Sequence, residues 1–137
     1  MKRSKINQSI REMEAMLKQY HVSLPPFCNW TPEEWEHKNH EYDEIRDNQL
    51  GWDITDCGLE NFDKVGFALI TIRNGNQKLE KYKKVYAEKL IYLKDGQTFP
   101  SHFHWIKSED IINRGGGTLL LKVYNDDGNG GYADTDV

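Results

Sequence analysis

The sequence lacks the features that mark exported, membrane-spanning or nucleic-acid-binding proteins. It has only 2 cysteines in 137 residues, too few for a disulfide framework, so we expect reduced thiols. No apolar run approaches the length of a membrane span, and no apolar signal segment follows the basic start. A formal net charge of −4 offers no attraction for nucleic acid or an anionic membrane. We therefore expect a cytoplasmic protein that binds neither.

The first third of the chain has helical patterns. The 37% hydrophobic and 29% charged residues are typical of a soluble globular domain, and the length suits a single one. Apolar residues at helical spacing predict an amphipathic helix from Ser4 to about Tyr20. The start Thr31-Pro32-Glu33-Glu34 predicts a second, short helix that ends near His40. Tyr42 to Leu50 is charged and reads as irregular.

Short strand candidates separated by turn residues fill the rest of the chain. The clearest is Gly66 to Arg73, and Asp95-Gly96 is a hairpin signal. The other candidates are Gly51 to Asp56, Val85 to Leu93, the segment around His102 and Thr118 to Tyr124. No helical pattern separates these strands, which argues against a parallel sheet. The order of elements predicts a barrel or sandwich with the helices outside it.

Two histidines two residues apart, with a glutamate soon after, form the one cluster suited to metal binding. In an extended chain alternate side chains share a face, so His102 and His104 should point into one cavity and Phe103 away from it. Glu109 follows a polar turn and could return as a third ligand. Two imidazoles and a carboxylate suit a divalent transition metal with positions left open for water or substrate.

The full spacing, Gly96-x5-His102-x-His104-x4-Glu109-x6-Gly116, resembles the first metal-binding motif of the cupins. Further segments, spread over nearly the whole chain, resemble the cupin-type D-lyxose isomerases. They are YDEIRDNQLGWDITD (Tyr42 to Asp56), TIRNGN (Thr71 to Asn76), YAEK (Tyr86 to Lys89) and HFHWIKSEDIINRGGG (His102 to Gly117). The resemblance implies an all-β fold, a cupin-like double-stranded β-helix or jelly-roll barrel. Residues 1–50 would form a helical arm packed on it, and 51–137 its first part.

The second cupin motif, which supplies a fourth ligand, has no match, because no histidine follows His104. We therefore expect an incomplete barrel, either a fragment or one that takes its missing ligand and strands from another chain. Exposed strand edges would then favour a homodimer.

The resemblance implies a metal-dependent aldose–ketose isomerase that interconverts D-lyxose and D-xylulose, with D-mannose and D-fructose as a second candidate pair. Manganese is the first choice of metal, and zinc, cobalt, iron or nickel would fit the same ligands. Lys107 could stabilise the enediolate with Glu109 as its catalytic neighbour, or be a solvated turn lysine. Alternation sends one of Glu88 and Lys89 inward toward the substrate. An inward Lys89 could bind a sugar hydroxyl or the oxyanion, and an inward Glu88 would be a candidate base. A cupin dioxygenase or epimerase, or a non-catalytic sugar-binding cupin, are the alternatives.

Overall fold

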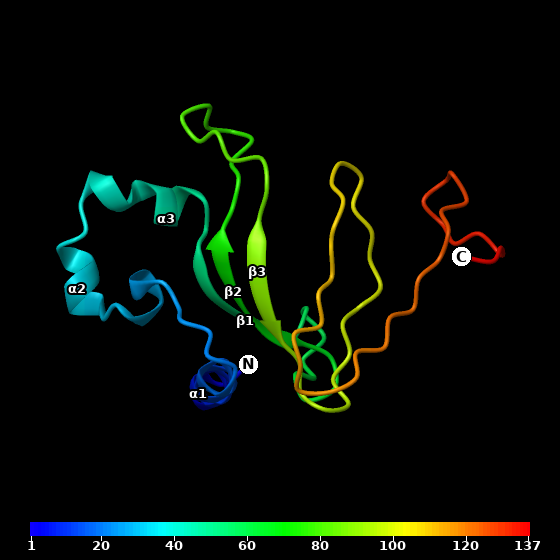
Figure 1. Cartoon of the computed structure of the whole chain (residues 1–137), viewed down its shortest axis with the longest axis horizontal. Coiled ribbons are helices and arrows are strands. Elements are labelled where there is room, and N and C mark those ends of the chain that lie inside the picture. Colours follow the sequence, from blue (N-terminus) through cyan, green and yellow to red (C-terminus); the bar gives the residue numbers. More distant parts are fainter. The chain divides into compact units, whose positions relative to one another are not determined.

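The computed structural model describes residues 1–137, with helices followed by one three-stranded antiparallel sheet (Figure 1). In chain order the elements are α1 (Arg3–Gln19), η1 (Pro26–Asn29), α2 (Pro32–Glu36), η2 (His40–Tyr42), α3 (Asp43–Asp47), β1 (Gly51–Thr55), β2 (Phe67–Arg73) and β3 (Glu88–Tyr92). The chain divides into two compact units, Met1–Ser101 and His102–Val137. All of these elements belong to the first unit, which mixes helix and antiparallel sheet and is not all-β. None of the helices is long and apolar enough to cross a bilayer.

The long helix forms where its spacing predicts it, and it covers one face of the sheet. Met13 is 1% exposed and joins Ala68 and Ile70 of β2 in the buried core. Leu17, one turn further along α1, packs against the same cluster. Burying these side chains anchors α1, which begins without a side-chain cap.

The strand with the clearest sequence signal lies in the middle of the sheet. Its order is β1-β2-β3, with Trp52 paired to Ile70 and Ile70 paired to Leu90. Residues 67–71 of β2 are all buried, so both faces of this central strand are covered. Phe67, on the alternate side from Ala68, stacks on Phe99 at 4.3 Å between ring centroids. The predicted strand that began at Val85 starts at Glu88.

The segment between α1 and the sheet contains the one helix that the sequence predicted there, together with a further α-helix and two 3-10 helices. The Thr31 side chain accepts from Glu34 N–H, and the Thr31 N–H donates to the Glu34 carboxylate, so the predicted helix start is a complete capping box. This helix ends at Glu36, before His40. The segment predicted to be irregular instead contains η2 and α3. Arg46 of α3 donates to the Asp43 carboxylate within the same helix and to the carbonyl of Asn39, the residue before η2, which ties the two helices together.

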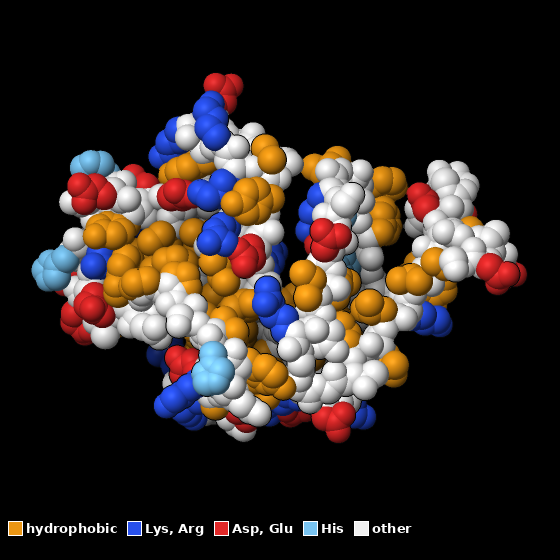
Figure 2. Space-filling view, viewed as in Figure 1, with side chains coloured by type: hydrophobic (Ala, Val, Ile, Leu, Met, Phe, Trp, Pro, Cys, Tyr) orange, Lys and Arg blue, Asp and Glu red, His pale blue; other side chains and the backbone are white.

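Aromatic side chains hold these short helices together. Trp30 makes edge-on contacts with Phe27, Trp35 and Tyr42 at centroid distances of 6.5, 5.0 and 5.2 Å. The Lys38 ammonium lies 4.1 Å from the Trp30 ring centroid and 5.1 Å from that of Tyr42. Figure 2 shows hydrophobic side chains gathered over this arm. Its stability thus comes from ring contacts, since helices of one turn are not stable alone.

Three asparagines join α3 to the loop between β2 and β3, and we call them the amide clasp: Asn48, Asn74 and Asn76. The Asn48 side chain, 2% exposed as a residue, donates to the Asn74 carbonyl and accepts from Asn76 Nδ2 at 2.9 Å. Asn74 Nδ2 donates back to the Asn48 carbonyl, and Asn76 Oδ1 accepts from the backbone of Lys78 and Leu79. Every amide of the clasp is therefore used in structural hydrogen bonds.

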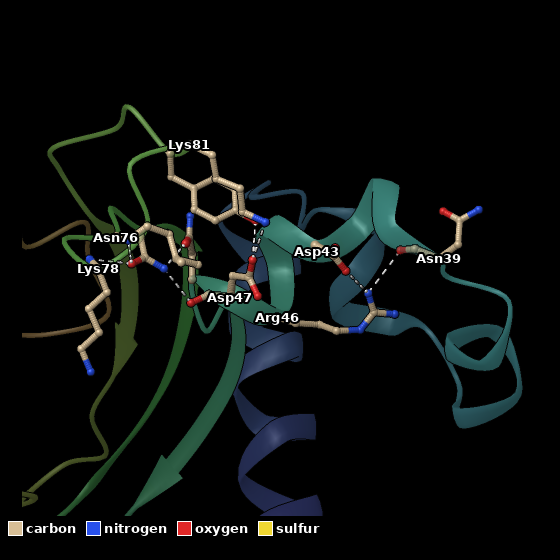
Figure 3. Close-up of polar contacts among 10 residues, drawn as sticks. Asn39, Asp43, Arg46, Asp47, Asn76, Lys78 and Lys81 are labelled. Atoms are coloured by element: carbon tan, nitrogen blue, oxygen red, sulfur yellow. Dashed lines mark hydrogen bonds and ion pairs between the residues drawn. The ribbon is translucent and has the colours of Figure 1, made fainter.

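An ionic group reinforces the clasp on the surface. Asp47 lies 2.9 Å from Lys81 Nζ and accepts from the Tyr82 hydroxyl at 2.7 Å, while Lys84 pairs with Glu44. Figure 3 shows Asp47, Lys81 and Asn76 gathered where the loop meets α3. These contacts fasten the far part of the loop to the same helix.

A glycine allows the two sides of this loop to approach. A Cβ added at Gly75 would lie 2.6 Å from the Lys84 carbonyl oxygen, so no larger residue fits. Asn74, Gly75 and Asn76 directly follow β2, where the strand ends. In the structure the same residues also fix where the loop lies.

The predicted strands around His102 and at Thr118 to Tyr124 do not form. The second unit contains extended backbone and turns, with one isolated bridge between Asp126 and Tyr132. Leu120 is 88% and Val123 60% exposed, so this apolar sequence has neither a ladder partner nor a covering layer. A strand exists only when a neighbour pairs with it, and no segment of the described chain pairs with these.

Candidate metal centre

The structure brings His102, His104 and Glu109 together within the second unit. One potential ligand atom from each residue lies within 4.8 Å of the other two. All three residues are exposed. The three residues that the sequence spacing predicted to lie together thus have their donor atoms close to one another in the structure.

Alternation along an extended chain positions the two imidazoles, although no strand forms. The rings of His102 and His104 lie 4.9 Å apart, edge to face. Phe103 and Trp105 form a second edge-on pair at 4.7 Å. A Cβ added at Gly130 would lie 3.7 Å from Trp105 and 3.9 Å from Phe103, so these rings sit against that glycine. The period of two survives because it depends on backbone extension alone, not on pairing.

Glu109 is the centre of the charge distribution at the site. Its Oε1 accepts from Lys107 Nζ at 2.6 Å and lies 3.1 Å from His104 Nε2. The hydrogen bond from Lys107 holds the pKa of Glu109 below its usual 4.5, and the nearby histidines act in the same direction. The carboxylate is therefore ionised at neutral pH, as a metal ligand must be.

The donor set fits a divalent transition metal. Manganese, zinc, iron, cobalt and nickel all accept imidazole nitrogen together with carboxylate oxygen. Three protein ligands leave coordination positions for water or a substrate oxygen. Because these side chains are exposed, other molecules can reach the group from solvent.

A family model described as D-lyxose isomerase matches residues 1–137. The chain belongs to this family. It is 44% identical over 138 residues to the D-lyxose/D-mannose isomerase of Escherichia coli O157:H7, and 41% identical to that of Serratia proteamaculans. These matches cover 100% of this chain but 61% and 60% of the relatives, so the chain spans about three fifths of their length. The resemblance to the D-lyxose isomerases is confirmed.

In this member of the D-lyxose isomerase family, the two predicted sugar-binding residues are adjacent on β3 in the first unit. Glu88 is half-buried on the side of Leu90, and its carboxylate pairs with Arg73. Lys89 is exposed and is paired across the ladder with Thr71. Glu88 is thus the more enclosed of the two, and Arg73 already neutralises its charge.

The sequence alone gave no role to the residues of the amide clasp, although all three lie in segments that resemble the D-lyxose isomerases. Asn48 lies in YDEIRDNQLGWDITD (Tyr42 to Asp56), and Asn74 and Asn76 lie in TIRNGN (Thr71 to Asn76). The signal that could have found them is three asparagines near strand ends, where side-chain amides often bond to backbone. Their pairing across 26 to 28 residues is a tertiary fact.

Proposed function

We propose that the protein is a metal-dependent aldose–ketose isomerase that interconverts D-lyxose and D-xylulose, with D-mannose and D-fructose as a second pair. Membership of the D-lyxose isomerase family supports the reaction class, and the names of both relatives support the two aldoses. The observation that carries the proposal is the meeting of His102, His104 and Glu109. Manganese is the metal we expect.

The proposed chemistry moves a proton between C1 and C2 of an open-chain sugar. A divalent metal held by His102, His104 and Glu109 would polarise the sugar carbonyl and acidify the neighbouring C–H. Lys107 carries a positive charge 2.6 Å from Glu109, and it would stabilise the negative charge of the enediolate. Glu109, ionised at neutral pH, would hold the metal and receive or return a proton at this position.

Sugar binding is assigned to Glu88 and Lys89 of β3. Successive strand residues face opposite sides, so we expect one of them at the substrate: Lys89 would donate to a sugar oxygen, or Glu88, whose carboxylate pairs with Arg73, would act as a base. We further propose that the sheet belongs to a cupin-type jelly-roll barrel, with residues 1–50 as its helical arm and 51–137 as its first part. A homodimer in the cytoplasm is the expected state of the protein.

Metal analysis of histidine variants tests the site directly. After equilibration with Mn²⁺ and removal of free metal, the wild-type chain should hold about one ion. His102→Ala and His104→Ala should each lose most of it, since each removes one of three ligands. His40→Ala, at an exposed histidine in η2, is the matched control and should retain it. Wild-type metal content in both His102 and His104 variants would refute the assignment.

A sugar panel tests the reaction. The Mn²⁺-loaded protein should form ketose from D-lyxose and from D-mannose, and Lys107→Met should lower kcat at saturating metal. Sugar binding without ketose formation would favour a non-catalytic cupin instead. Oxidation or epimerisation of the sugar would favour another cupin enzyme.

A further inference from the structure

Lys107 occupies a position that a metal ion would compete for. Its ammonium donates to Oε1 of Glu109 at 2.6 Å, and the same oxygen lies 3.1 Å from His104 Nε2. The carboxylate oxygen closest to an imidazole donor is therefore the one that already holds a cation. A metal held by His104 and Glu109 would therefore compete with Lys107 for this carboxylate.

From this geometry we infer that Lys107 is an internal counter-ion of the metal centre, which lowers its affinity for divalent metal and keeps it neutral without metal. This inference rests on the proposed metal site. The ammonium balances the Glu109 charge, so an arriving cation meets less negative potential than two histidines and a bare carboxylate would offer. It must also break a charge-assisted hydrogen bond or stay beside a like charge.

The lysine can be displaced because it is not enclosed. Its side chain is 47% exposed, and that of Glu109 is 43% exposed, so the ammonium can turn to water at small cost. A displaced Lys107 remains two residues from Glu109. Its ammonium group could then interact with a substrate oxygen. The same lysine would thus act as counter-ion before metal binding and stabilise the enediolate afterwards.

The test is a calorimetric titration of each protein with Mn²⁺ alone, at one fixed pH. Lys107→Met should bind Mn²⁺ about two- to fivefold more tightly than wild type, the size of one exposed ion pair. Lys107→Arg keeps the charge and should stay near wild type. Lys122→Met removes an exposed lysine of the same unit and controls for net charge. Its affinity should not change.

The outcomes separate this inference from the proposed function. If wild type binds Mn²⁺ through His102 and His104 but Lys107→Met binds no more tightly, the counter-ion role is wrong and the metal site stands. An equal gain in Lys122→Met would also overturn it, since the effect would then be general electrostatics. If neither wild type nor Lys107→Met binds Mn²⁺, the metal site itself fails and both ideas fall.

Discussion

Removing the central amide of the clasp should destabilise the first unit measurably. In Asn48→Ala the hydrogen bond to the Asn74 carbonyl and the one from Asn76 Nδ2 both disappear. Each contributes about 1 kcal/mol net, and a buried partner left without a bond adds to the loss. We therefore expect the free energy of unfolding to fall by about 2–3 kcal/mol. For a chain of this size that corresponds to a Tm lower by roughly 6–10 °C.

Urea unfolding followed by tryptophan fluorescence is a suitable assay, since the chain has 4 tryptophans. Asn7→Ala, at an exposed position in α1, is the matched control and should be neutral or slightly stabilising because alanine favours helix. A double-mutant cycle isolates the shared bond: Asn48→Ala and Asn76→Ala together should cost about 1 kcal/mol less than the sum of the two.

Two results would refute this reasoning. If Asn48→Ala lies within about 0.5 kcal/mol of wild type, the clasp is not a stabilising element. If Asn48→Ala and Asn76→Ala add without coupling, their amides do not share a bond that matters for stability.

Two further predictions concern ionisable groups. Lys94 donates a hydrogen bond to the Glu12 carboxylate at 2.5 Å, and this bond is the main cause that holds the pKa of Glu12 below its usual 4.5. The pair therefore stabilises the fold above about pH 4.5. Its contribution is lost as the pH falls through the lowered pKa that Glu12 has in the folded protein. The Tm difference between wild type and Glu12→Gln should thus be largest near neutral pH and shrink toward about pH 3; a constant difference would contradict the pairing. Burial raises the pKa of Cys28 to about 11 while Cys57 is exposed, so a thiol reagent at about pH 8 should modify Cys57 and reach Cys28 only after unfolding. Equal labelling rates in the folded protein would contradict this.

Local patterns in the sequence were sufficient wherever a structure depends on near neighbours. The periodicity around Met13 predicted α1, and the Thr31 to Glu34 motif predicted the start of α2. The apolar run of β2 predicted the central strand. These features arise from contacts three or four residues apart, or from one continuous buried segment, so the sequence alone contains them.

The grouping of His102, His104 and Glu109 was also foreseeable, because extended backbone sets the two histidines on one side whether or not a strand forms. What the sequence did not determine was which partner each charged group takes. Lys107 is held by Glu109, and Glu88 by Arg73, and neither pairing follows from spacing alone.

Only the tertiary structure decided which segments pair. The segment TLLLKVY, residues 118–124, has a high β-propensity, yet it has no ladder partner and forms no strand. Asn48 and Asn76 show the converse, since neither has a local signal for pairing and they meet across 28 residues. Side-chain propensity is a property of the residue itself, whereas ladders and clasps require a second segment at the right distance. That second segment is set by the folded chain as a whole.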